Sequence, residues 1–134
     1  MLDRLHNDAT GKLVVRLTVG VLMLFHGVAK LLHPGSLEFI GNSLAGAGLP
    51  SFVAYGVYAG EIIAPLMVIT GFHSRIGGLI IMVNMIFAIA LAHTGDIFSL
   101  TQHGGWAIEL QVFYLLGGLA VALLGSGRIA IKPD

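Results

Sequence analysis

The stretch FVAYGVYAGEIIAPLMVITGF, residues 52–72, decides the class of fold, because its 21 residues hold a single charge, Glu61. A helix of this length is about 30 Å long at 1.5 Å per residue, which matches the hydrocarbon core of a bilayer. Pro65 follows Glu61 by four positions, about one helical turn. The stretch therefore predicts a membrane-spanning helix with a carboxylate near its middle.

Further apolar runs of similar length lie on both sides of this stretch, at residues 13–32, 76–93 and 106–125. Such long continuous runs are typical of transmembrane helices and not of the alternating strands of a membrane barrel. We predict an all-α integral membrane protein with one domain over residues 1–134, a four-transmembrane-helix bundle. Its helices are expected at about residues 12–32, 52–72, 75–94 and 106–125.

The composition supports a membrane protein. Hydrophobic residues make up 56% of the chain and charged residues 10%, with a mean hydropathy of +0.90. A soluble domain has about 25% charged residues. Seven basic and seven acidic residues cancel, and no basic stripe is present, which argues against nucleic-acid binding. The lack of cysteine excludes thiol–disulfide chemistry and cysteine-ligated iron–sulfur clusters.

The connections suggest how the helices are arranged. The first connection, HPGSLEFIGNSLAGAGLP, has apolar residues at roughly helical spacing after Ser36, a suitable N-cap. We predict a short interfacial helix in this first outer loop. The basic residues gather on one side of the predicted membrane, so the positive-inside rule places both termini in the cytoplasm. These residues are Arg4, Lys12, Arg75, Arg128 and Lys132. Arg16, near the same side, is expected to snorkel to the headgroups.

Polar groups concentrate in the outer half of the predicted bundle. His26 and Lys30 share one face of the first helix, and His93 ends the third. Ionisable groups at membrane depth cost at least ~2.5–3.5 kcal/mol near the centre, so they usually face the bundle interior or water. We expect an outward-opening polar pocket with either a Lys30–Glu61 or a His26–Glu61 pair. On straight untilted helices the depth of His26 matches that of Glu61 better. The alternative is a purely structural ion pair.

The candidate site residues follow from this pattern. The candidate catalytic residues are Glu61, Lys30 and His26. The candidate ligand-binding residues are His93, Glu109, Trp106 and Tyr58. Gln111 lies on the fourth helix near Glu109, and Asn84 is expected to form a helix–helix hydrogen bond.

Pro65 adds a backbone feature to the same place. It has no N–H to bond the carbonyl of Glu61, so we expect that carbonyl to be free for another helix, water or a ligand. The alternative is a simple packing kink. Gly56 and Gly60 have the spacing that permits close helix approach.

No metal site is expected. Haem ligation by His26 and His93, or copper or zinc binding with His33 or His103, is chemically conceivable, but no single helix carries a metal-ligand pair. We therefore predict no intrinsic cofactor.

Several stretches together resemble the DoxX family of small membrane proteins. They are RLTVGVLMLFHGVAKLL, then GLP before the second helix, Glu61 within it, GFHSRIGG at its end, and LLGSGRIAIKPD, which is similar to the family's terminal GPGR-x-S-L-D. The similarity spans about residues 16–134. Ser126 and Ala130 depart from this pattern, where the family commonly has proline and serine.

The resemblance implies a four-helix bundle in the bacterial cytoplasmic (inner) membrane. It also implies a link to membrane oxidoreductase systems, which include the DoxD-type subunit of thiosulfate:quinone oxidoreductase. The positions that match recurring polar residues of the family are His26, Gly27, Lys30, Glu61 and His93.

We therefore expect a subunit of a membrane oxidoreductase system that binds a quinone-like molecule in the outer-half pocket. Lys30 or His26 would hydrogen-bond a quinone oxygen, and Glu61 would set their charge or relay a proton. Electrons would come from a partner or a soluble substrate. The alternative is a non-catalytic accessory or assembly subunit of a larger membrane complex, with membrane protein partners or a homo-oligomer. Whether the chain is itself an enzyme stays open.

Overall fold

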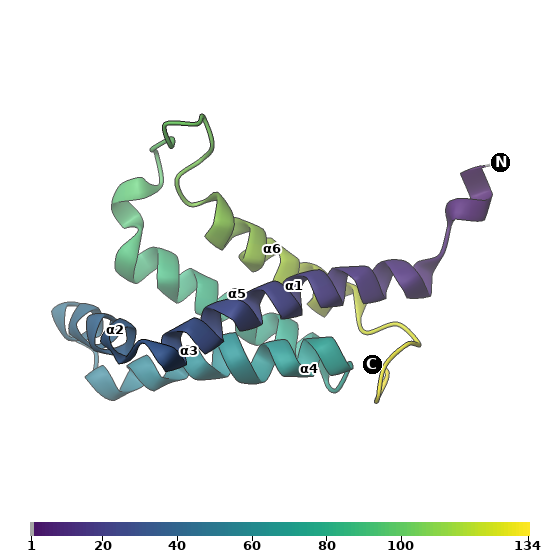
Figure 1. Ribbon diagram of the computed structural model, residues 1–134, viewed down its shortest axis with the longest axis horizontal. Helices are drawn as coiled ribbons and strands as arrows, with labels where there is room; N and C mark the ends of the chain where they lie inside the picture. The colour runs from purple at the N-terminus through teal and green to yellow at the C-terminus, as the bar shows by residue number, and fades with distance from the viewer. Residues whose placement is uncertain (1) are drawn as a thin grey trace.

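The computed structural model describes residues 2–134, and its regular elements in that part of the chain are all helical. α1 (Asp8–Leu32) runs along the length of the molecule, and α2 (Pro34–Gly46) lies at the end away from both termini (Figure 1). α5 (Ser74–Ala92) and α6 (Glu109–Leu124) pack beside each other as a hairpin. Two further elements, η1 (Leu2–Leu5) and η4 (Thr94–Asp96), are short 3-10 turns.

The second long helical stretch, Ser51–Thr70, is built from four segments, and we call it the second rod. A 3-10 turn, η2 (Ser51–Tyr55), leads into α3 (Gly56–Tyr58), a π-helical turn, η3 (Ala59–Ile63), and α4 (Ala64–Thr70). The Ala64 N–H donates to the Ala59 carbonyl, five residues back, and Pro65 occupies the first turn of α4. A proline is tolerated in a first helical turn, so the widened turn lets the rod continue through Pro65. The backbone irregularity next to this proline is a π-turn, and the free Glu61 carbonyl stays a prediction.

Three helical stretches are long and apolar enough to cross a membrane. They have 25, 20 and 19 residues, at Asp8–Leu32, Ser51–Thr70 and Ser74–Ala92. α6 is apolar but has 16 residues, and it begins at Glu109 and not at residue 106 as predicted. Trp106 lies in the preceding loop, where its indole N–H donates to the Ile97 carbonyl at 2.6 Å. The expected fourth span and the cytoplasmic termini stay predictions.

The predicted interfacial segment is helical, but the predicted cap is wrong. α2 begins at Pro34, two residues before Ser36, with His33 as its N-cap. Proline favours the first helical position because its fixed φ suits a helix and its missing N–H would be unsatisfied there anyway. Ser36 therefore lies inside the helix.

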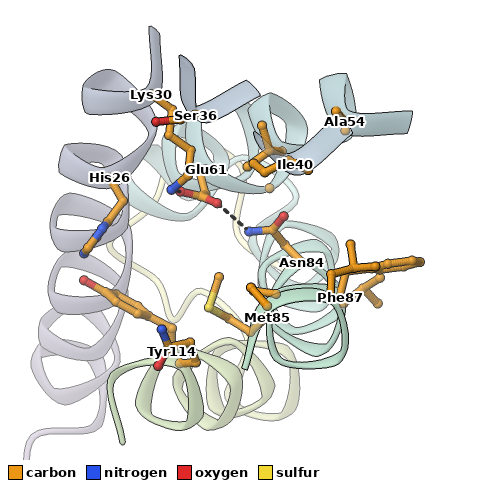
Figure 2. Close-up of a pocket in the computed structure, with 18 of the residues that line it drawn as sticks. His26, Lys30, Ser36, Ile40, Ala54, Glu61, Asn84, Met85, Phe87 and Tyr114 are labelled. Carbon is orange, nitrogen blue, oxygen red and sulfur yellow. Dashed lines mark hydrogen bonds and ion pairs between the residues drawn. The ribbon is translucent and has the colours of Figure 1, made fainter. Parts of the chain in front are cut away.

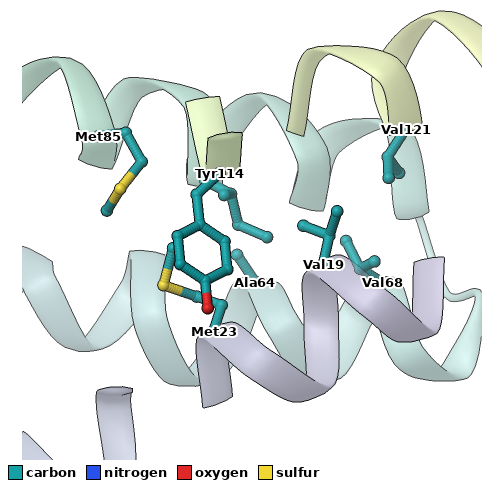
Figure 3. Packing of buried hydrophobic residues seen from close by; sticks show 8 residues of the cluster. Val19, Met23, Ala64, Val68, Met85, Tyr114 and Val121 are labelled. Atoms are coloured by element: carbon teal, nitrogen blue, oxygen red, sulfur yellow. The ribbon is translucent and has the colours of Figure 1, made fainter. Parts of the chain in front are cut away.

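Glycines let the helices pack closely. A Cβ on Gly78 of α5 would fall 2.5 Å from the Gly118 carbonyl oxygen of α6, and one on Gly20 of α1 would fall 3.0 Å from the Pro65 carbonyl oxygen. Small residues at such crossings are the usual means of helix association in lipid. Between these crossings lies an apolar cluster from all four long helical rods (Figure 3). Its members are Val19, Met23, Ala64, Val68, Ile81, Met85, Tyr114 and Val121.

Arg16 does not snorkel. Its side chain is 1% exposed and donates four hydrogen bonds of 2.6–3.0 Å to backbone carbonyls. The end of α4 leaves carbonyls without helical partners, and the planar guanidinium can bond several of them at once. The acceptors are the carbonyls of Val68, Ile69, Ser126 and Ile129. Arg16 thus holds the C-terminal segment, residues 125–134, against the end of α4.

Asp134 continues this attachment. Its carboxylate accepts hydrogen bonds from Ser74 Oγ at 2.7 Å and from the Arg75 N–H at 3.0 Å, at the first turn of α5. A carboxylate is favourable at a helix N-terminus because of the unpaired N–H groups there. The C-terminus therefore lies at the end of the bundle where α4 turns into α5 (Figure 1).

Candidate functional site

A cavity of about 880 Å³ lies at the α2 end of the bundle. It is bounded by α1, α2, the η2–η3 stretch, α5 and α6, and its walls are mainly apolar (Figure 2). A large apolar cavity with a few polar groups is the usual form of a small-molecule site. The polar or titratable side chains in its lining are His26, Lys30, Ser36, Ser43, Glu61, Asn84, His93, Gln111 and Tyr114.

Glu61 is the centre of the polar part of this cavity. Lys30 Nζ lies 2.5 Å from Glu61 Oε1, and Asn84 Nδ2 donates to Glu61 Oε2 at 3.0 Å. Glu61 is 4% exposed, so its charge is buried and needs such partners. Three helical rods thus supply one hydrogen-bonded array. The predicted interhelical hydrogen bond of Asn84 is confirmed.

The partner of Glu61 is Lys30 and not His26, because of how α1 meets the second rod. A Cβ on Gly27 would collide with the Glu61 carbonyl oxygen, so the two backbones touch at this level. Lys30 lies three residues after Gly27, on the same face of α1, and its long stem reaches back to the carboxylate. The predicted depth match of His26 assumed straight, untilted helices, and it does not decide the pair.

Gly60 makes room for the third member of the array. A Cβ there would fall 2.5 Å from the Asn84 Cβ, so the glycine lets α5 bring the amide up to Glu61. A Cβ on Gly56 would meet nothing within 4 Å, and Gly56 instead lines the cavity. The expected close approach therefore occurs at Gly60 but not at Gly56.

His26 faces α6. Its ring lies edge-on to Tyr114, with ring centroids 5.6 Å apart and an interplanar angle of 83°. Such an edge-to-face pair is a favourable aromatic arrangement. The pair bridges α1 and α6 on the opposite side of the cavity from Asn84 (Figure 2). Sequence reasoning missed Tyr114, although its position three residues after Gln111 places both on one face of α6.

His93 lies at the rim of the cavity in a second polar group. Its Nδ1 is 3.3 Å from Asp96 Oδ2, and its Nε2 is 3.3 Å from Gln111 Nε2. Gln111 Oε1 is buried and has no hydrogen-bond partner among the described residues. This leaves an acceptor atom for a ligand or water at the rim.

The other predicted ligand-binding residues lie outside the cavity lining. Glu109 is exposed at the start of α6, beside Gly105, and Trp106 is held in the loop before it. Tyr58 lies edge-on to Tyr55, with ring centroids 6.4 Å apart. Of the four predicted ligand-binding residues, His93 thus lines the cavity, while Glu109, Trp106 and Tyr58 do not. A ligand-binding role for these outer residues stays a prediction.

Metal-ligating side chains do not gather anywhere in the described part of the chain. No group of three or more His, Cys, Asp or Glu residues has the closeness that a metal ion needs within residues 2–134. The polar groups that the cavity presents at Glu61 are an ammonium, a carboxylate and an amide, those of Lys30, Glu61 and Asn84.

The family model described as DoxX matches residues 11–94 of this chain. A protein of Bacillus subtilis (strain 168) named "Putative oxidoreductase CatD" is 32% identical over 124 residues, which are 92% of this chain and 85% of that protein. A Haemophilus influenzae protein whose printed name assigns no activity is 29% identical over 120 residues, 87% of this chain and 84% of its own. No solved structure matches the chain significantly. The family match spans Lys30, Glu61 and Asn84, and the chain belongs to the DoxX family.

Proposed function

We propose that this chain is a component of a membrane oxidoreductase system in the bacterial cytoplasmic membrane and binds a quinone-like molecule beside Lys30. The oxidoreductase part of this proposal draws on the family and on the name of the Bacillus subtilis relative. The binding part draws on the cavity, whose size lies in the range of known small-molecule sites.

The observation that carries the proposal is the position of Lys30 Nζ. An ammonium has three N–H donors, and the described residues give it one partner, Glu61 Oε1. Two donors therefore remain for the carbonyl oxygen of a quinone. Lys30 lines the cavity and its side chain is 26% exposed, so a ligand can reach it.

Glu61 has two effects in this arrangement. Its carboxylate pairs with the Lys30 ammonium, and the pair would provide a proton at the point where a quinone oxygen would lie. His26 is a second donor on the same helix face. This chain would bind the quinone and supply protons to its oxygens. A redox partner or second substrate would exchange the electrons with it.

The test is binding of decylubiquinone to the purified protein in nanodiscs. The key variant is the double substitution Lys30→Met with Glu61→Gln, because removing both charges avoids leaving one buried alone. We expect it to bind decylubiquinone at least about tenfold more weakly, a loss of one charge-assisted hydrogen bond. Lys12→Met is the matched control, since Lys12 pairs with Asp8 far along α1 from the cavity.

The proposal is wrong if wild-type protein fails to bind decylubiquinone, or if the double variant binds it as tightly as wild type with its fold intact by circular dichroism. Isolation of the chain only with stoichiometric protein partners and without a bound small molecule would support the accessory-subunit alternative instead.

A further inference from the structure

The cavity extends well beyond the polar array. On α5 its lining continues along one face for most of the helix, through apolar side chains at spacings of three and four residues. These are Ile76, Leu79, Ile80, Val83 and Phe87. From Ile76 to Phe87 the helix rises about 16 Å. We call this strip of five side chains the α5 groove.

The cavity is open on this side. Phe39 of α2 is 61% exposed and Ile76 is 52% exposed, yet both belong to its lining. Figure 2 shows Ile40 and Ala54 on one border of the opening and Asn84 and Phe87 on the other. The exposed lining is apolar, and its α5 part belongs to a helix long and apolar enough to cross a membrane. On such a membrane-spanning helix this opening would face the lipid.

On the opposite side of the cavity His26 and Tyr114 meet edge-on, and the buried side chains of Met23 and Met85 belong to the same apolar cluster as Tyr114 (Figures 2 and 3). A molecule that dissolves in the bilayer can thus enter between α2 and α5. It would meet apolar side chains first and Lys30 afterwards.

From this continuity we propose that the natural ligand carries a long apolar tail, which lies in the α5 groove while its head group hydrogen-bonds Lys30. The inference rests on the proposed function for the head group and adds the class of ligand, a quinone with an alkyl or isoprenoid tail. Burial of the tail provides affinity in proportion to its apolar area, and Lys30 selects the head group.

The first experiment compares two quinones with the same dimethoxy-methyl-benzoquinone head, one without a tail and one with a decyl tail. The groove variant is Val83→Trp, which fills the groove, and the control is Val21→Trp on an exposed face of α1 that does not line the cavity. We expect Val83→Trp to weaken binding of the decyl quinone by about tenfold, the cost of about two methylene groups kept from burial. Binding of the tailless quinone should stay within about twofold, and the control should change neither.

A second experiment needs no groove variant. A quinone with a diazirine at the end of its tail, irradiated with the wild-type protein in nanodiscs, should label the peptide that contains residues 76–83. Labelling should disappear in the Lys30→Met, Glu61→Gln double variant, because the head group would no longer fix the tail. Labelling spread evenly over lipid-facing helices would overturn the inference.

The two proposals fail in different ways. If the tailless quinone binds wild type and the tail adds nothing, or if Val83→Trp weakens both quinones equally, the tail inference is wrong and the proposed function stands. If neither quinone binds, both proposals are wrong. Native mass spectrometry that finds only a phospholipid in the cavity, undisplaced by either quinone, would also overturn the inference.

Discussion

Gly27 of α1 lies against the backbone carbonyl of Glu61, and this contact sets the level at which Lys30 meets the Glu61 carboxylate. The ion pair is therefore a consequence of a backbone contact made by a residue without a side chain. Lys30 can reach Glu61 only while the two helices stay this close.

Gly27→Ala should separate α1 from the second rod. The added methyl group collides with the Glu61 carbonyl, and overpacking of this kind costs about 1–3 kcal/mol of unfolding free energy. Gly11→Ala in the same helix is the control, since a Cβ there meets nothing within 4 Å and alanine favours a helix by about 0.5–1 kcal/mol. Thermal unfolding in one detergent measures both. Equal effects of the two substitutions would contradict the packing account.

The charges of Lys30 and Glu61 should show strong coupling in stability. Lys30→Met alone leaves a carboxylate that is 4% exposed with only Asn84 as partner, so we expect a loss of about 3–5 kcal/mol. Adding Glu61→Gln should recover much of this loss, because no buried charge then remains. A double-mutant cycle by chemical unfolding measures the coupling. The surface pair of Asp8 and Lys12 is the comparison, and its removal should leave the unfolding midpoint unchanged. Additive effects at Lys30 and Glu61 would show that the pair carries no coupling.

Arg16→Lys should release the C-terminal segment although it keeps the charge. A lysine cannot place four donors on the carbonyls that Arg16 contacts, and each lost hydrogen bond from a charged group costs about 1.5–3 kcal/mol. We expect a loss of about 3 kcal/mol or more and faster proteolysis within residues 125–134. Arg4→Lys at an exposed position is the control. Unchanged protease resistance of the Arg16 variant would mean that other contacts hold the segment.

Acid should loosen the same segment through Asp134. Burial raises the pKa of Asp134, but hydrogen bonds from Ser74, the Arg75 N–H and the Ser126 N–H, together with the charge of Arg75, lower it below its ordinary value of 3.8. A carboxyl group with a lowered pKa in the folded state stabilises above its unfolded pKa and loses this contribution as the pH falls through the folded pKa. Stability should therefore fall below about pH 4 in wild type and fall less steeply in Asp134→Asn.

Thermal unfolding at a series of pH values checks this, with Ser74→Ala as an intermediate case that removes one of the hydrogen bonds. The same acid slope in wild type and Asp134→Asn would assign the acid sensitivity to another group.

Local pattern predicted much of this fold. The helical runs and the short helix α2 follow from apolar stretches and from the spacing of apolar residues, which act within one segment. The predicted start of α6 was wrong because the Trp106 indole N–H donates to a carbonyl of the preceding loop. Hydropathy does not reveal a contact of this kind.

The candidate site likewise combines features that local sequence predicts with features that depend on contacts between distant segments. The residue types around Glu61 were predictable from the cost of polar groups in lipid. The choice of Lys30 over His26 depends on the contact at Gly27, and the burial of Arg16 depends on a segment about 110 residues away that folds back onto α4. Both are long-range geometry, which spacing along one helix does not determine.

The π-turn at Ala59–Ile63 means that the rod contains, in effect, one residue more than a regular α-helix of the same path. Each residue of a regular helix advances it by about 100°, and the widened turn takes up the extra residue without passing that rotation on to its flanks. Deletion of Ala59 would therefore convert the turn into regular helix and leave Gly56 and α4 on the faces they now occupy. The cavity wall before the turn and the apolar core after it thus tolerate a change in chain length between them.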